Sequence, residues 1–147
     1  IKAFLEAEAH DGPSLIIAYS HCIAHGYDMM HGLEQQKAAV LSGYWPLMRY
    51  NPALRLAGKN PFQLDSQAPS IPLKQYAYQE ARYTMLARSN PDAAARLLAL
   101  AQEDVERRWR VYSNRAALQM PKLSEDSPAD SAAAQPAPAK GAAKGDE

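Results

Sequence analysis

One short segment carries the residues best suited to chemistry: SHCIAHG, at residues 20–26, holds the chain's single cysteine and two of its four histidines. Thiolate and imidazole are both zinc ligands, and a nearby imidazole can also help to form a reactive thiolate. A structural zinc site needs four ligands, so Cys22 and His25 would require His10 and His31 to join them. Their short spacing is weak support for either a zinc site or a nucleophilic pair. A lone cysteine is commonly a small buried apolar residue, and that interpretation also stays open.

The residues before this segment predict the element that positions it. Residues 14–19, SLIIAY, form a continuous apolar run between turn residues, which is typical of a strand buried on both faces of a parallel sheet. Residues 1–9 read as the end of a helix that HDGP, at residues 10–13, stops, so helix and strand together indicate the end of a βαβ unit. Because ligand sites lie beyond the carboxyl ends of such strands, Cys22 is expected where chemistry takes place.

Shorter elements are predicted in the middle of the chain. Residues 32–42 read as a helix, and Gly43 is a suitable residue to end it. The aromatic stretch at residues 44–52 contains two prolines and suits a short edge strand or an extended packing segment. A second short strand is predicted over residues 62–64.

Two helices are predicted to follow. Pro72 suits the first turn of a helix that runs to about residue 88. The triplet Asn90-Pro91-Asp92 supplies a cap, a proline at the first helical position and an acid in the first turn of a helix that continues to about residue 118. Apolar residues recur along this second helix at steps of three and four, which predicts packing onto a neighbouring helix or domain rather than a cofactor role; they are Leu97, Ala101, Val105, Trp109, Tyr112 and Ala116.

The composition changes at Pro121. From there on the chain consists almost entirely of Pro, Ala, Ser, Lys, Asp, Glu and Gly, which cannot bury enough apolar surface to offset the entropy of ordering. We therefore predict a disordered tail over residues 121–147. A second boundary at residue 64 leaves residues 1–64 as one unit and residues 65–120 as a helical extension.

The composition of the whole chain argues against several classes of protein. Sixteen basic and sixteen acidic residues give a formal net charge of zero, which disfavours binding to nucleic acid. No apolar run approaches the roughly 20 residues that a membrane span needs, and a single cysteine cannot form an internal disulfide. No targeting signal is recognisable, so a cytoplasmic location is expected. The chain begins at Ile1 inside an uncapped helix, which favours a fragment of a longer protein.

Three blocks of the sequence are recognisable together. They read EAEAHDGPSLIIAYSHCIAHG at residues 6–26, SGYWPLMRYNP at residues 42–52 and GKNPFQLDS at residues 58–66. In residue identity, order and spacing they closely resemble the late part of the thiamine-diphosphate domain in single-chain pyruvate:ferredoxin (flavodoxin) oxidoreductases. The resemblance runs from Ile1 to about Tyr112. It implies an α/β fold, in which the terminal part of a thiamine-diphosphate-binding parallel-sheet domain is followed by C-terminal helices and a disordered tail.

The resemblance also implies a role for Cys22. In this family a cysteine in the corresponding loop is the fourth ligand of the 4Fe-4S cluster nearest the thiamine cofactor, and the other three ligands lie upstream. The family's thiamine-diphosphate signature, Gly-Asp-Gly with a later Asn-Asn that holds Mg²⁺ and the diphosphate, is not in this sequence. The neighbouring Ser20, His21 and His25 are expected to tune the cluster potential through hydrogen bonds or polarity.

By the same resemblance, the parent enzyme converts pyruvate and coenzyme A to acetyl-CoA and carbon dioxide. Electrons leave through 4Fe-4S clusters to ferredoxin or flavodoxin, and the enzyme is expected to be a homodimer. This chain carries one of the cluster's ligands, so we expect it to be inactive alone.

Two other interpretations stay beside this one. The first is a stand-alone binding or scaffold module in which Cys22 is buried and the long C-terminal helix forms a partner interface; the uncapped first helix argues against it. The second is a small zinc-binding protein that uses Cys22 and His25.

Overall fold

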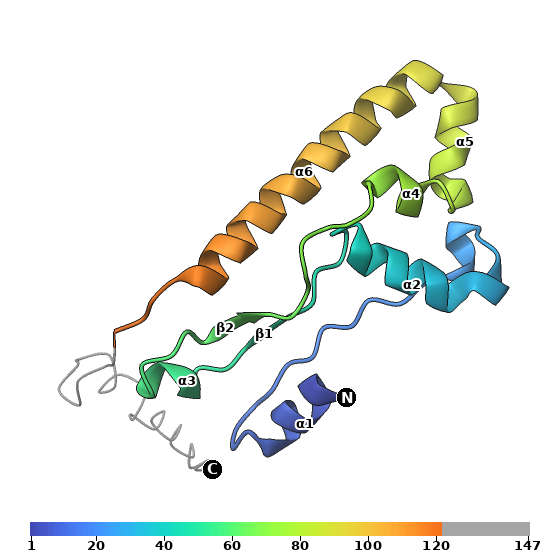
Figure 1. Ribbon diagram of the computed structural model, residues 1–147. Helices are drawn as coiled ribbons and strands as arrows, with labels where there is room; N and C mark the ends of the chain where they lie inside the picture. Colours follow the sequence, from blue (N-terminus) through green and yellow to red (C-terminus); the bar gives the residue numbers. More distant parts are fainter. Residues whose placement is uncertain (122–147) are drawn as a thin grey trace, which may run out of the picture.

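The computed structural model describes residues 1–121, and Figure 1 shows a long C-terminal helix that runs along one side of shorter elements. The predicted disordered tail lies, from residue 122 onward, outside the described residues. Within the described part, no helix is long and apolar enough to cross a membrane. The elements in chain order are α1 (Lys2–Ala9), the 3-10 helices η1 (Ile23–His25) and η2 (Met29–His31), α2 (Gly32–Leu41), β1 (Met48–Tyr50), α3 (Ala53–Leu56), β2 (Phe62–Leu64), α4 (Leu73–Ala77), α5 (Ala81–Ser89) and α6 (Pro91–Ala117).

The segment between α1 and η1 corrects one prediction. Residues 14–19 are extended but belong to no strand, and the side chains of Leu15 and Ile17 are 85% and 72% exposed. The prediction of a strand buried on both faces is therefore wrong for this structure. A strand needs a neighbour that takes up its backbone hydrogen bonds, and no described residue pairs with this segment as a strand. Helix α1 before it is confirmed.

The two short strands are confirmed and form one hairpin-like sheet. Strands β1 and β2 pair antiparallel, with Arg49 opposite Gln63 at the centre. The single sheet among the described residues is thus antiparallel and two-stranded. Together with the helices it gives an α/β chain in the broad sense.

Helix α2 ends as its sequence predicts. The amide of Gly43 donates to the carbonyl of Val40, and Gly43 has a φ of 73°, the left-handed conformation that favours glycine at a helix end. A Cβ atom at Gly43 would lie 2.7 Å from Cγ of Pro69, so a larger residue would also crowd the following loop.

The single helix predicted from Pro72 to about residue 88 is wrong, because the structure divides it into α4 and α5. Between them Glu80 is extended, with φ −106° and ψ 129°. The helix potential of residues 72–88 is overridden by tertiary contacts, since the side chain of Glu80 is fully buried against other elements.

Helix α6 follows its predicted start. The side chain of Asn90 accepts a hydrogen bond from the amide of Ala93, and Pro91 occupies the first helical position. Val105, in the middle of the predicted apolar stripe, is buried, whereas Leu97 near its beginning is about half exposed. At the other end, the side-chain amide of Asn60 donates to carbonyls of the last turn, including that of Arg115 at 2.7 Å.

One hydrophobic core joins both sides of the boundary predicted at residue 64. It consists of Ala38, Ala39, Leu73, Tyr76, Ala77 and Val105. Tyr19, Tyr44 and Trp45 pack against it, and the rings of Tyr44 and Tyr76 have centroids 4.7 Å apart. The core therefore holds α2, α4 and α6 together, and the two-unit division remains a prediction.

Candidate functional site

Cys22 lies at the surface, at the start of a tight turn. It is the residue before η1, with φ −138° and ψ 137°, and its thiol is free and exposed. Its carbonyl accepts a hydrogen bond from the amide of His25 at 2.9 Å. The interpretation of Cys22 as a buried apolar residue is therefore wrong. An exposed thiol on an ordered turn is open to a ligand or a reactant.

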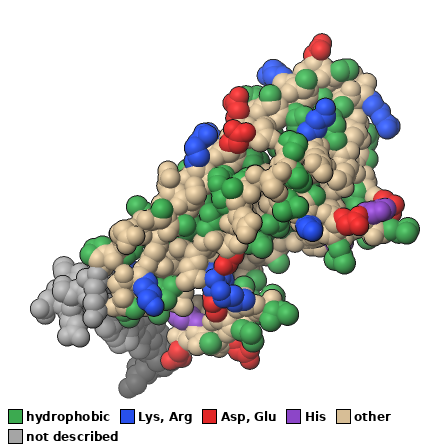
Figure 2. Space-filling model, viewed as in Figure 1, with side chains coloured by type: hydrophobic (Ala, Val, Ile, Leu, Met, Phe, Trp, Pro, Cys, Tyr) green, Lys and Arg blue, Asp and Glu red, His purple; other side chains and the backbone are tan. Residues whose placement is uncertain are grey.

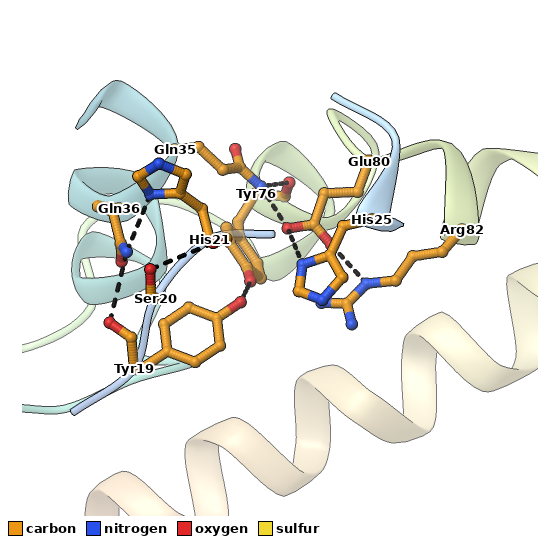
Figure 3. Close-up of polar contacts among 9 residues, drawn as sticks. All are labelled: Tyr19, Ser20, His21, His25, Gln35, Gln36, Tyr76, Glu80 and Arg82. Atoms are coloured by element: carbon orange, nitrogen blue, oxygen red, sulfur yellow. Dashed lines mark hydrogen bonds and ion pairs between the residues drawn. The ribbon is translucent and has the colours of Figure 1, made fainter. Parts of the chain in front are cut away.

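His25 faces a buried carboxylate on the opposite side of its turn (Figure 3). Its Nδ1 lies 3.7 Å from Oε1 of Glu80, and the side chains of His25 and Glu80 are 20% and 0% exposed. Oε1 of Glu80 accepts a hydrogen bond from Nε2 of Gln35 at 2.9 Å, and Oε2 accepts one from Nε of Arg82. Residues of three elements, η1, α2 and α5, thus converge on one carboxylate.

The backbone makes a second connection at the same place. The amide of Ala81 donates to the carbonyl of Gly26 at 2.7 Å. Gly26 has a φ of 69°, and a Cβ atom placed on it would lie 2.6 Å from Cβ of Ala81. Only glycine meets both the conformation and the spacing here. The turn that begins at Cys22 is therefore closed against the start of α5.

His21 is turned toward α2 instead. Its Nδ1 lies 3.1 Å from Nε2 of Gln36, whose amide also approaches the carbonyl of Tyr19 at 3.4 Å. The hydroxyl of Ser20 donates to the carbonyl of His21 at 3.2 Å. Ser20, His21 and Cys22 follow one another on this segment. The ring of His21 contacts Gln36 of α2, whereas the ring of His25 faces Glu80 before α5 (Figure 3).

Tyr27 adds a feature that the sequence did not indicate. Its hydroxyl is buried and, within residues 1–121, has no hydrogen-bond partner. Burial raises the pKa of Tyr27, and the nearby Cys22 raises this pKa further, since a thiolate disfavours a second negative charge. Tyr27 thus places a buried hydroxyl near the cysteine.

The zinc interpretation finds no support in the described part of the chain. Nowhere in it do three or more His, Cys, Asp and Glu side chains come together in a way that could hold a metal ion. Nδ1 of His31 lies 3.1 Å from Oδ2 of Asp28, while His10 lines a separate surface cavity of about 420 Å³ beside α1 and β1. His25 is directed at Glu80. The four residues required for zinc are thus not assembled.

Arg49 is engaged within the chain. Its guanidinium donates to both Oδ atoms of Asp65, at 2.6 and 2.7 Å, and also to the carboxylate of Glu6 on α1. These hydrogen bonds hold the pKa of Asp65 below its usual range and raise that of Arg49. The group ties α1 to the hairpin and leaves little of Arg49 for an external anion.

Sequence reasoning missed Glu80, Gln35 and Arg82 around the cysteine-bearing turn. Gln35 and Glu80 are 45 positions apart, and neither lies in a recognisable motif. The one available signal was an acidic residue at a position where a predicted helix should bury apolar side chains.

The comparisons with known proteins place this geometry in context. No protein-family model matches the chain. It is 58% identical over 112 residues to the pyruvate-flavodoxin oxidoreductase of Nostoc sp.. The matched residues make up 76% of this chain and 9% of that protein. The pyruvate:ferredoxin oxidoreductase of Moorella thermoacetica is 47% identical over 116 residues, covering 79% of this chain and 10% of its own length.

A third relative carries a different electron acceptor in its name. It is the mitochondrial NADP⁺ pyruvate dehydrogenase of Euglena gracilis, 42% identical over 114 residues, or 76% of this chain and 6% of that protein. The chain thus spans about a tenth, or less, of the length of these relatives. At this level of identity it belongs, as a segment, to the family of the pyruvate:flavodoxin and pyruvate:ferredoxin oxidoreductases.

Proposed function

We propose that this chain is a C-terminal segment of an enzyme that oxidatively decarboxylates pyruvate with coenzyme A to acetyl-CoA and carbon dioxide. Electrons would pass through 4Fe-4S clusters to ferredoxin or flavodoxin. The observation that carries the proposal is the identity of 58% over 112 residues with a protein named pyruvate-flavodoxin oxidoreductase. A homodimeric assembly and a cytoplasmic location belong to the same proposal, as the resemblance implies.

Within that enzyme, Cys22 would supply one thiolate to the 4Fe-4S cluster nearest the thiamine. Its exposed thiol at the start of an ordered turn fits a single ligand. A four-iron cluster takes about four thiolates, and Cys22 is the one cysteine here, so the remaining ligands would come from other parts of the longer protein. When bound, such a cluster accepts and passes on single electrons. Thiamine diphosphate and Mg²⁺ would likewise be held mainly outside this chain.

The neighbours of Cys22 would adjust the surroundings of the cluster. Ser20 and His21 are linked by the hydroxyl of Ser20 to the backbone, and His21 is fixed by Gln36. These contacts keep polar groups beside the cysteine, and polar groups around a cluster shift its reduction potential. His25 would contribute in the same way.

The test is to replace Cys22 with serine in the longer protein. In Cys22→Ser we expect loss of the electron paramagnetic resonance signal of one 4Fe-4S cluster and about four fewer irons per chain. Ile23→Ser is the matched control, since Ile23 is exposed on the same turn and should keep all its iron. A full complement of iron in Cys22→Ser would refute the ligand assignment.

The 147-residue chain alone should be inactive. It carries one cysteine, and one thiolate does not assemble a four-iron cluster. Pyruvate-dependent reduction of a viologen dye by the purified chain, under anaerobic conditions with iron, sulfide and thiamine diphosphate added, would contradict this expectation.

A further inference from the structure

The break between α4 and α5 is built around one buried acid that the proposed chemistry does not use. Glu80 precedes α5, at the position where a short polar side chain such as that of Ser, Thr, Asp or Asn commonly caps the helix by accepting from a backbone amide. Its side chain makes no such cap. Both carboxylate oxygens are instead directed at residues of other segments and at Arg82 (Figure 3).

Burial of this carboxylate is costly and therefore informative. Glu80 is fully buried, and a buried charge destabilises a fold unless it is paired and hydrogen-bonded. Arg82 supplies the opposite charge and Gln35 a second donor. A simple helix junction needs no such arrangement. The carboxylate also faces the ring of His25, whose Nδ1 lies 3.7 Å from Oε1, beyond hydrogen-bond distance, and has no other hydrogen-bond partner among the described residues.

We propose that Glu80 is a positioning residue for the cysteine: through His25, it fixes the turn that carries Cys22. This inference rests on the proposed function of Cys22 as a cluster ligand. The amide of His25 donates a hydrogen bond to the carbonyl of Cys22, and the amide of Gly26 donates one to the carbonyl of Ile23. A displacement of the His25 ring or of Gly26 is therefore transmitted to Cys22 over a single turn.

Ala81, the residue after Glu80, makes a further contact with the turn that carries Cys22. Ala81 donates its amide to the carbonyl of Gly26 and sets its methyl group against the glycine. The carboxylate thus lies beside the ring of His25, while Ala81 fixes the backbone directly after it. Groups that orient a metal ligand from behind affect the metal's affinity and potential without touching the metal.

The experiment uses the longer protein, purified anaerobically with its clusters. Four proteins are compared with the wild type: Glu80→Gln, His25→Ala, the double variant, and Glu103→Gln, a matched control on the exposed face of α6. The readouts are iron per chain and the midpoint potential of the cluster at Cys22, from a redox titration followed by electron paramagnetic resonance. We expect each single variant to shift this potential and Glu103→Gln to leave it unchanged.

The double variant decides how Glu80 acts. If Glu80 works through His25, the double variant has the same potential as His25→Ala, because the two changes remove one pathway. If the shift caused by Glu80→Gln persists undiminished in the His25→Ala background, the carboxylate acts by its charge through space and the positioning role is refuted. A wild-type potential in Glu80→Gln refutes it as well.

The design separates this inference from the proposed function. His25 is partly exposed, so His25→Ala is expected to fold even if Glu80→Gln does not, and a wild-type potential in His25→Ala would overturn the inference by itself. Cys22→Ser is measured in parallel. If it keeps its cluster, the ligand assignment fails; if it loses the cluster while the Glu80 and His25 variants match the wild type, only the positioning role fails.

Discussion

The first 31 residues leave large apolar side chains exposed, whereas the core formed by α2, α4 and α6 buries them. In the core, Tyr76 and Val105 are 0% and 2% exposed. In the N-terminal region, Leu15 and Met30 are 85% and 90% exposed. Figure 2 accordingly shows hydrophobic side chains at many places on the surface of the face that it presents.

The difference in exposure indicates which residues cover the apolar side chains of each region. The core elements bury one another, so their apolar residues are satisfied within the chain. The N-terminal region has few such neighbours. Apolar exposure on this scale commonly marks an interaction surface. Because the chain spans about a tenth of the relatives it matches, we expect other parts of the longer protein to cover this region.

The largest effect is expected from truncating the centre of the core. Tyr76 is buried, its hydroxyl lies 2.7 Å from that of Tyr19, and its ring contacts Tyr44. Tyr76→Ala should lower the free energy of unfolding by about 3–5 kcal/mol, measured by urea denaturation of the 147-residue chain. Tyr50→Ala, at an exposed tyrosine, is the matched control and should cost less than about 1 kcal/mol. Equal losses in both would mean that burial in the core does not set the cost of losing a tyrosine side chain.

A smaller effect is expected where the cysteine-bearing turn meets the core. Gly26→Ala forces a side chain into a left-handed conformation and against Ala81. It should cost about 1–3 kcal/mol of unfolding free energy, from backbone strain and overpacking together. Adding Ala81→Gly removes the crowding but not the backbone strain. The loss of unfolding free energy in the double variant should therefore be smaller than the sum of the losses in Gly26→Ala and Ala81→Gly. An unchanged urea midpoint in Gly26→Ala would mean that the turn is not fixed against α5.

The ion pair between Arg49 and Asp65 at the hairpin predicts a pH dependence. Arg49 lowers the pKa of Asp65, so this pair stabilises the fold above about pH 3.9, the pKa of an unfolded aspartate, and the stabilisation is lost as the pH falls through the lower folded value. Because Asp65 is about one third exposed, the contribution is at most about 1 kcal/mol. Urea midpoints of wild type and Arg49→Gln should differ at pH 6 and converge at about pH 2. A difference that is constant across this range would exclude the ion pair as its cause.

The smallest effect is expected in the exposed N-terminal region. Leu15→Ser should change the unfolding free energy of the 147-residue chain by less than about 0.5 kcal/mol, since the side chain already faces solvent. In the longer protein the same substitution should lower the thermal midpoint, because there we expect Leu15 to be covered. Thermal denaturation of both proteins makes the measurement, and a neutral result in the longer protein would leave the region without a partner.

Local signals in the sequence were sufficient for the elements that depend on local chemistry. Helix α6 starts at its asparagine cap and proline, Gly43 takes the left-handed conformation just after the end of α2, and both short strands lie where they were predicted. Each of these features is decided by a few neighbouring residues. The exposed position of Cys22 agrees with a ligand role, but the ligand role itself came from resemblance and stays a prediction.

The failures have a common physical cause. The strand predicted over residues 14–19 needs a neighbouring strand, and the helix predicted over residues 72–88 is broken by the contacts of Glu80 with Gln35, Arg82 and His25. Both outcomes depend on residues far away in the sequence. Hydrophobic periodicity reports what a segment can bury but not which partner is present, so neither result could be derived from the segment itself.

The hydrogen bond between Gly26 and Ala81 has a consequence for the order of events during synthesis. A ribosome that adds about 5–20 residues per second needs roughly 3–11 seconds to proceed from residue 26 to residue 81. During that interval the cysteine has been made, but the backbone that closes its turn has not. If Cys22 is a cluster ligand, as proposed, maturation of that cluster belongs after the appearance of α5, and a nascent chain that stalls earlier would present an unanchored thiol to the cell's iron and oxidants.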